Sequence, residues 1–97
     1  MKFDWDERKA AANFKKHRIS FEEARRAFDD PFALQALDDK HSTKFEIRKW
    51  LIGEADPGVL VVIFTIRESG SVYRLISARK ANRKERAIYE TFKGIPI

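Results

Sequence analysis

The chain has 97 residues, with 20 lysines and arginines against 15 acidic residues, a net charge of +5 and no cysteine. The length fits one domain spanning residues 1–97, and the lack of cysteine excludes disulfides, thiolate metal sites and cysteine nucleophiles. The two histidines lack the spacing of a zinc site, so we expect neither a metal nor another cofactor. The charge favours an anionic partner such as nucleic acid, although solvation alone also explains many basic surfaces.

No segment resembles an export signal or a membrane anchor. The N-terminal stretch MKFDWDERK is charged and poor in apolar residues, unlike a signal peptide. The longest apolar run, residues 59–64, is far too short to cross a bilayer. We therefore expect a cytoplasmic protein with no membrane contact.

The first third of the sequence predicts two helices. Asp6 is a suitable N-cap for a helix over residues 7–16. Ser20 followed by Glu23 forms a capping box at the start of a second helix. That helix must stop before Pro31, because the residue preceding a proline is pushed out of the α region.

The middle of the chain predicts a sheet and the end predicts a third helix. The segment 59–66 is almost uniformly apolar, as in a central strand covered on both faces. A capping box formed by Asn82 and Glu85 starts the last helix, and Gly94 ends it. The candidate strands are residues 32–37, 45–52, 59–66 and 72–79. This order predicts an α+β fold, with two N-terminal helices, a three- to four-stranded antiparallel sheet and a C-terminal helix.

The last two strands predict a hairpin that brings two arginines together. A two-residue turn at Ser69–Gly70 would pair Arg67 with Val72. The same register places Arg74 on the face of Arg67, since directly opposite residues share a face. Two neighbouring guanidinium groups match the geometry of a phosphate. They are equally compatible with solvated arginines near a surface glutamate such as Glu68.

If the hairpin register that pairs Arg67 with Val72 continues without a break, Ile63 lies opposite Ile76. Ser77 and Arg79 then lie on the face opposite to Arg67. That face is the more apolar one, and we expect it to pack on the main core. A site shared by Arg67 and Arg79 then requires one of two departures. Either Arg79 lies beyond the end of the strand, or a bulge shifts the register.

The strand-to-helix junction at residues 77–89 is dense in charge. A helix N-terminus favours anions, so basic residues there are unfavourable unless something negative binds. The local conflict points to function, whereas an exposed charged helix is the competing interpretation.

Such a cluster could cleave RNA through the RNA's own 2′-hydroxyl. Cleavage needs a base, an acid and positive charge on the phosphorane, and it needs no metal. His17 and His41 lie far in sequence from the arginines, and His17 ends a basic helix, where a surface or capping role is the more common one. No residue is an unmistakable base. The candidates are Glu46 or Glu85 as base, Tyr89 for positioning or proton donation, and Arg67, Arg74 and Arg79 for the phosphate.

Taken together, these residues resemble the BrnT family of bacterial toxins, and the resemblance extends along essentially the whole chain. The N-terminal elements are Phe3-Asp4-Trp5-Asp6, Lys9, Asn13, Lys16-His17, Ser20-Phe21-Glu22-Glu23-Ala24, Phe28 and Asp30-Pro31. The central elements are Glu46, Arg48 and Ile52-Gly53. The C-terminal elements are Thr65, Arg67, Arg74, Ile76-Ser77-Ala78-Arg79, Ala81, Glu85-Arg86 and Tyr89.

The resemblance implies a RelE-like fold and a metal-independent endoribonuclease that arrests growth. It implies a BrnA-type ribbon-helix-helix antitoxin as partner, in a hetero-oligomer that reaches operator DNA through the antitoxin. A non-catalytic nucleic-acid-binding or co-repressor module is the alternative. The resemblance places toxicity on Arg67 and Arg79, and we extend the catalytic set to Arg74, Glu85 and Tyr89. The predicted RNA contacts are Arg83, Arg86, Lys80 and Arg48.

One position departs from the family pattern. The family usually has glycine after Lys-His, where this chain has Arg18. Glycine adopts the left-handed conformation that ends many helices at little cost. We expect Arg18 either to be strained in that conformation by about 1 kcal/mol or to end the helix differently.

Overall fold

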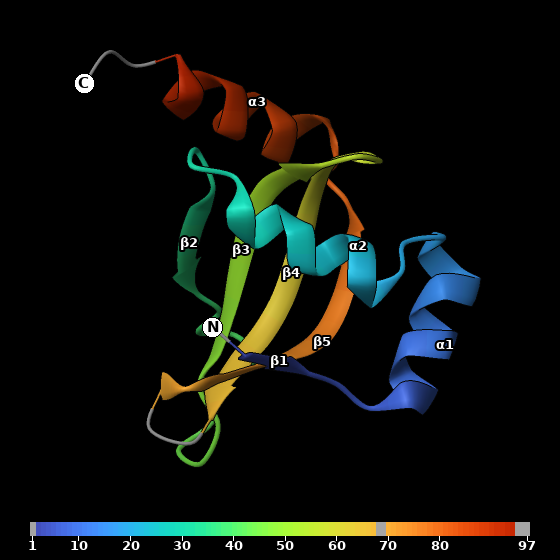
Figure 1. Cartoon of the computed structure of the whole chain (residues 1–97). Coiled ribbons are helices and arrows are strands. Elements are labelled where there is room, and N and C mark those ends of the chain that lie inside the picture. The colour runs from blue at the N-terminus through green and yellow to red at the C-terminus, as the bar shows by residue number, and fades with distance from the viewer. Residues whose placement is uncertain (1, 68–69, 95–97) are drawn as a thin grey trace.

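A five-stranded sheet and three α-helices make up the fold in the computed structural model, which describes residues 2–67 and 70–94 (Figure 1). In chain order the elements are β1 (Lys2–Asp4), α1 (Glu7–His17), α2 (Phe21–Arg26), the 3-10 helix η1 (Ala27–Asp29), β2 (Leu34–Leu37), β3 (Arg48–Ala55), β4 (Gly58–Arg67), β5 (Val72–Lys80) and α3 (Arg83–Lys93). No helix in the described part of the chain is long and apolar enough to cross a bilayer.

The strands are ordered β1-β5-β4-β3-β2, so the apolar strand β4 is central as predicted. The predicted α+β class and the antiparallel run from β2 to β5 are confirmed. The predicted strand number and the all-antiparallel sheet are wrong, because β1 is a fifth strand that runs parallel to β5 and pairs Phe3 with Tyr73. Three residues are too few to show the alternation by which a strand is recognised in a sequence.

The predicted caps start all three helices. The Asp6 carboxylate accepts hydrogen bonds from the first backbone N–H groups of α1. Both reciprocal bonds of the Ser20–Glu23 capping box are present at the start of α2. Arg18 ends α1 in the left-handed conformation, with φ 61°, which is the strained alternative that the missing glycine predicts.

Helix α2 and η1 cover one face of the sheet, and α1 lies to the side, next to β5 (Figure 1). The side chains of the core on this face are Ile19, Phe21, Ala24, Ala27, Leu51, Leu60, Val62, Phe64, Leu75 and Ala78. Gly53 allows η1 to approach β3, because a Cβ at this position would lie 2.6 Å from the carbonyl oxygen of Ala27. This face is therefore closed by direct packing of helix on strand.

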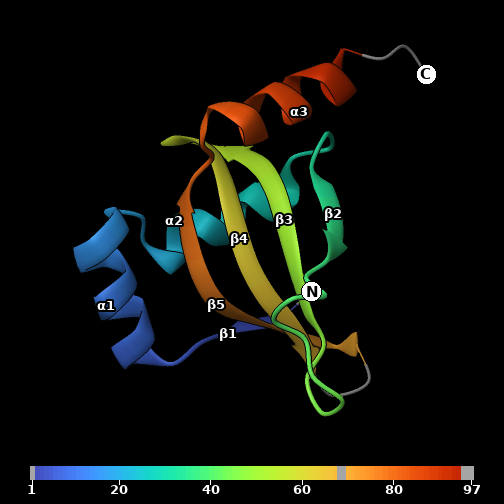
Figure 2. The same cartoon turned by 180° about the vertical axis from the view of Figure 1, so that it is seen from behind.

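The opposite face is covered only at its two ends (Figure 2). Helix α3 lies across one end, where Tyr89 packs with Ile52, Val59 and Val61. The segment 38–47 lies over the other end, and the Thr65 hydroxyl donates to the carbonyl of Ile47. We call this opposite face of the sheet the open face.

A bulge in β5 decides which side chains reach the open face. The predicted pairs Arg67–Val72 and Thr65–Arg74 are confirmed, while Glu68 and Ser69 of the predicted turn lie outside the described residues. Beyond the pair Phe64–Leu75 the register shifts, so that Ile63 pairs with Ser77 and Ile76 is the extra residue. The expected pair Ile63–Ile76 is therefore wrong.

The bulge corrects the predicted faces of the end of β5. Ala78 enters the core, whereas Arg79 pairs with Val61 and joins Arg67 on the open face. The expected place of Ser77 and Arg79 on the core face is wrong, because a shift of one residue exchanges the two faces of a strand. Of the two departures considered, the bulge is the one that occurs.

Asn13 fixes β5 just after this bulge. Its buried amide donates to the carbonyls of Ala78 and Ile19 and accepts from the N–H of Ala78. Strand β1 pairs only with Val72–Arg74, so the Asn13 side chain takes the place of a neighbouring strand at Ala78. The buried backbone groups there are thereby satisfied.

The strand predicted at residues 45–52 begins three residues later, at Arg48. Thr43 prevents an earlier start of the strand. Its hydroxyl accepts hydrogen bonds from the N–H groups of Phe45 and Glu46, and its own N–H donates to the Glu46 carbonyl. These bonds fold residues 43–46 into a turn, and Phe45 is left 91% exposed.

Candidate active site

Two adjoining hollows, of about 360 and 310 Å³, lie on the open face between α3 and the segment 38–47. Both are lined by Asp38, His41, Val61, Ile63 and Arg79. The first also contains Trp50, Ile52, Glu85 and Ile88, and the second Arg48, Ile76 and Ser77. We call the two hollows together the cleft. An apolar floor with a few polar groups at its edge is typical of a ligand site.

His41 is held at the edge of the cleft by Asp38. Its Nδ1 lies 2.9 Å from one carboxylate oxygen of Asp38 and 3.1 Å from the other. A carboxylate accepts hydrogen bonds, so this contact favours the tautomer of a neutral imidazole that carries its proton on Nδ1 and leaves Nε2 as an acceptor. The His41 side chain is 59% exposed and that of Asp38 is 14% exposed, so the imidazole is oriented and remains accessible.

Hydrogen bonds fix the turn on which Asp38 and His41 lie. The Asp38 N–H donates to the carbonyl of Arg48. The Ser42 hydroxyl donates to the Asp38 carbonyl and accepts from the Arg48 N–H. The start of β3 thus fixes the backbone on both sides of His41.

Arg79 reaches the cleft from β5 and makes a bidentate pair with Glu85. Its Nη1 and Nη2 lie 2.7 and 2.8 Å from the two Glu85 oxygens. Hydrogen bonding from Arg79 holds the pKa of Glu85 below its ordinary value, although burial acts against this. Arginine has five N–H donors, and the Arg79 side chain is 40% exposed, so donors remain for a phosphate.

Glu85 is therefore held as an anion by two neighbours. Besides Arg79, the backbone N–H of Asn82 donates to it in the capping box. A carboxylate kept ionised in this way is a poor proton acceptor. Its geometry suits the positioning of Arg79 better than the predicted role of base.

Arg48 and Arg67 share the carboxylate of Glu46. The Arg48 Nε lies 2.8 Å from Glu46 and the Arg67 Nη2 lies 3.5 Å from it. Hydrogen bonding from Arg48 lowers the pKa of Glu46 more than burial raises it. Glu46 thus connects Arg48, at the edge of the cleft, with Arg67, near the end of β4.

Arg67 and Arg74 lie outside the cleft. Arg79 pairs with Val61, and Arg67 lies six residues further along β4, about 20 Å along an extended strand. Arg74 is paired with Asp4 of β1 at 3.3 Å. The three arginines share a face but cannot hold one phosphate together.

Tyr89, a residue of α3, is fully buried. Its hydroxyl donates to Asp30, which also accepts from the backbone N–H groups of Phe32 and Glu54. Burial, together with the hydrogen bond to Asp30, raises the pKa of Tyr89 well above its ordinary value. These contacts attach α3 to the sheet and keep the hydroxyl away from the cleft.

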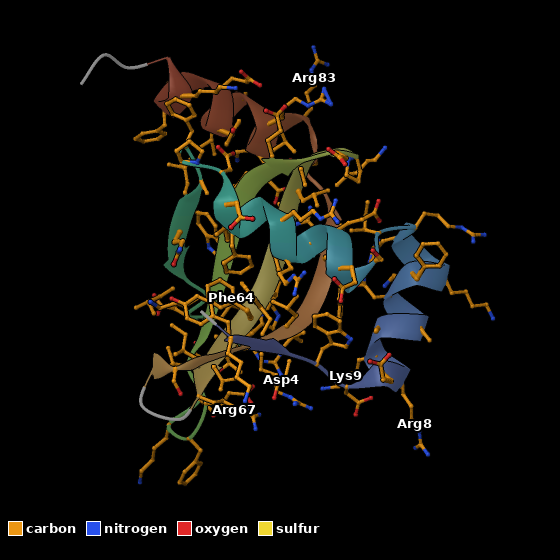
Figure 3. The ribbon with its side chains drawn as sticks, viewed as in Figure 1. Asp4, Arg8, Lys9, Phe64, Arg67 and Arg83 are labelled. Carbon is orange, nitrogen blue, oxygen red and sulfur yellow. The ribbon has the colours of Figure 1, made fainter. Side chains whose placement is uncertain are left out.

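The remaining predicted RNA contacts surround the start of α3. Lys80, Arg83 and Arg86 are exposed. Figure 3 shows Arg83 at one end of the molecule and Arg67 at the other. The predicted basic residues therefore form an extended set instead of one cluster.

Sequence reasoning missed His41, Asp38 and Ser77. His41 was set aside because 38 positions separate it from Arg79 in the sequence. One sequence signal could have identified His41, namely the spacing Asp38-x-x-His41 in a polar turn before a strand. A nearby carboxylate often orients a functional imidazole.

A larger open hollow of about 560 Å³ lies beside η1 and is a poor site for RNA. It is lined by Asp29, Asp30, Glu54, Asp56, Arg26 and Ala55. Four carboxylates facing one arginine repel a phosphate. Within the described ranges, no group of three or more histidine and acidic side chains could hold a metal ion.

Comparison with known proteins identifies the family to which the chain belongs. No curated protein matches the sequence. The family described as "Ribonuclease toxin, BrnT, of type II toxin-antitoxin system" matches residues 5–85, a range that contains every residue lining the cleft except Ile88. The match covers most of the chain, so the protein belongs to the BrnT family of ribonuclease toxins of type II toxin–antitoxin systems.

Proposed function

We propose that the protein is a metal-independent endoribonuclease and that the cleft is its catalytic centre. The observation that carries the proposal is the Asp38–His41 pair facing the same hollows as Arg79. It supplies an oriented proton acceptor and a phosphate-binding fork, which are the base and the positive charge among the three requirements of RNA cleavage. Family membership supports the ribonuclease class.

In the proposed reaction His41 Nε2 takes the proton of the RNA 2′-hydroxyl. The 2′ oxygen then attacks the adjacent phosphorus, and the bond from phosphorus to the 5′ oxygen breaks. The leaving 5′ oxygen takes a proton from water, and the hydroxide that remains takes the proton from the His41 imidazolium, which restores neutral His41. The products are a 2′,3′-cyclic phosphate and a 5′-hydroxyl end.

The remaining polar groups of the cleft have supporting roles. Arg79 donates to the non-bridging phosphate oxygens, where negative charge grows in the transition state. Glu85 positions Arg79, and Asp38 stabilises the imidazolium that forms on His41. Arg48 and Ser77, which line the second hollow, contact the phosphate and its neighbouring ribose.

The biological setting follows from family membership. A type II system implies a protein antitoxin. We propose that this antitoxin is of the BrnA ribbon-helix-helix type, that the two proteins form a hetero-oligomer, and that operator DNA is bound through the antitoxin. The free toxin would cleave RNA in the cytoplasm and arrest growth.

The test uses the two histidines as a matched pair. Purified protein is incubated with RNA in EDTA, and the cleavage rate and the new ends are measured for the wild type, His41→Ala and His17→Ala. Loss of a general base costs about 10²- to 10⁴-fold in rate. We expect that loss for His41→Ala, wild-type cleavage for His17→Ala, and cyclic phosphate ends.

Three results would contradict the proposal. Intact RNA with the wild-type protein, together with salt-sensitive RNA binding, would support the alternative of a non-catalytic nucleic-acid-binding or co-repressor module. Unchanged cleavage by His41→Ala would remove His41 from the reaction. Ends that carry a 5′-phosphate would exclude attack by the 2′-hydroxyl.

A further inference from the structure

A second hollow site lies on the open face at the end of β4 farthest from α3. It has a volume of about 450 Å³ and is lined by Phe45, Glu46, Ile47, Thr65, Ile66 and Arg67. It adjoins the cleft at Arg48, which pairs with Thr65 in the sheet and contacts the Glu46 carboxylate. We call it the tip site, and Arg67 marks its position in Figure 3.

Phe45 is the most exposed large apolar side chain that the structure describes, at 91%. It stands on a turn fixed by two hydrogen bonds to the Thr43 hydroxyl and by the bond from Thr65 to Ile47. The Lys44 ammonium lies 5.8 Å from the centre of the ring. An exposed aromatic ring on a fixed turn, beside a cation, is an arrangement on which unpaired bases stack.

Arg67 supplies the charge that a phosphate at this site would need. Its side chain is 51% exposed, and its partner Glu46 is held more closely by Arg48. Two guanidinium groups thus share one carboxylate and leave a net positive charge, to which Lys44 adds. The charge favours an anion over a neutral or basic protein surface.

The tip site is continuous with the cleft through Glu46. Arg48 lines the cleft and Arg67 lines the tip site, and both contact this carboxylate. Arg79 and Arg67 lie on the same face of the sheet, about 20 Å apart along β4. Thr65, the residue of β4 between the cleft and Arg67, is buried and bonded to Ile47. One nucleic-acid strand that follows the direction of β4 and crosses over the segment 38–47 could therefore occupy both sites.

We propose that Phe45 and Arg67 bind RNA, Phe45 by stacking on a base and Arg67 by contacting its phosphate, so that the substrate is a single strand that follows the direction of β4. The proposal rests on the proposed function for the role of the cleft. A base inside a duplex is paired and stacked, so only unpaired RNA can place a base on Phe45. The tip site would select single-stranded RNA and set how much of it the cleft receives.

The experiment measures binding of RNA that cannot be cleaved. An unstructured 12-nucleotide 2′-O-methyl RNA with a fluorescent label lacks the attacking hydroxyl, so its Kd is independent of catalysis. We expect Phe45→Ala to raise this Kd by about 5- to 150-fold and Phe45→Trp to restore it. Phe14→Ala is the control, because Phe14 is an exposed phenylalanine on α1, which lies next to β5 and lines neither the cleft nor the tip site.

A second arm tests the phosphate contact. Arg67→Ala should weaken binding and reduce the slope of log Kd against log salt by about one. Arg25→Ala removes the same charge from α2 on the other face and should leave the slope unchanged. Thermal melts confirm that each variant is folded.

An unchanged Kd for Phe45→Ala would overturn the proposal. A loss of antitoxin affinity in that same variant would then assign Phe45 to the protein partner. Equal losses for the single strand and for a hairpin duplex of the same length would overturn the selection of unpaired RNA. A failure of cleavage with intact Phe45-dependent binding would refute only the proposed function.

Discussion

The two faces of the sheet are closed in different ways. Helix α2 and η1 cover one face, and polar groups at its edge, such as the Asn13 amide of α1, are buried and fully paired with backbone. The open face is covered only at its ends, and its polar groups pair with one another while keeping exposure, as His41 and Arg79 do.

The covered face therefore contributes mainly to stability, whereas the open face carries the groups that a substrate can reach. Burial of apolar side chains contributes most of the free energy of folding, and the larger core lies on the helix-covered face. Charged pairs at a partly exposed cleft contribute little stability, but they place donors where a substrate can reach them. Substitutions on the covered face should therefore change stability, and substitutions in the cleft should change activity.

After His41→Ala, the largest effect on cleavage is expected for Arg79→Lys in the cleft. Lysine keeps the charge but cannot make two parallel contacts with Glu85 or with a phosphate. We expect cleavage to fall about 10²- to 10³-fold with little change in the urea midpoint. An equal loss of stability and activity would break the distinction between the faces.

Asn13→Ala should be the most destabilising change on the covered face. It leaves the N–H and carbonyl of Ala78 and the carbonyl of Ile19 without their buried partner. The expected loss in the free energy of unfolding is about 2–4 kcal/mol, measured by urea denaturation. If Asn13→Ala lowers the free energy of unfolding by less than an exposed substitution such as Arg25→Ala, water has replaced the Asn13 amide as the hydrogen-bond partner.

Gly53→Ala tests the packing of η1 on β3. The new Cβ would meet the Ala27 carbonyl oxygen at 2.6 Å, and backbone must move to relieve the contact. We expect a loss of about 1–3 kcal/mol in the free energy of unfolding. Gly94→Ala is the control, because its nearest contact is at 3.5 Å.

Acid should loosen α3 before α1. The pKa of Glu85 is lowered chiefly by Arg79, and the pKa of Asp30 is lowered because hydrogen bonds, led by that from Tyr89, outweigh its burial. Both carboxylates therefore stabilise the fold above their ordinary pKa values of 4.5 and 3.8, and this contribution is lost as the pH falls below them. Amide hydrogen exchange should show α3 opening first, and earlier protection loss in α1 would contradict this.

The smallest expected effect is a gain from Arg18→Gly. Arg18 adopts φ 61°, a conformation that costs a non-glycine residue about 1 kcal/mol. The larger unfolded-state entropy of glycine offsets part of the gain. We expect the free energy of unfolding to rise by about 0.5 kcal/mol, and a fall would mean that the Arg18–Phe14 contact outweighs the strain.

Much of the fold was predictable because it depends on local interactions. The caps at Asp6, Ser20 and Asn82 and the apolar run of β4 involve residues close in sequence. The short strand β1 was not predictable, since it forms only by pairing with β5, about 70 positions later. Of the candidate site, the sequence indicated Arg79, Glu85 and Arg48, whereas His41 became a candidate only in three dimensions.

By itself the sequence determined the three helices, the four longer strands, the positive charge and the resemblance to one toxin family. Tertiary structure alone decided which side chains meet. One extra residue at Ile76 exchanges the faces of the end of β5, because side chains alternate at every position. That exchange brings Arg79 to the open face beside His41 and sends Ala78 to Asn13, 65 residues away in the sequence. A pairing so distant leaves no local signal in the chain.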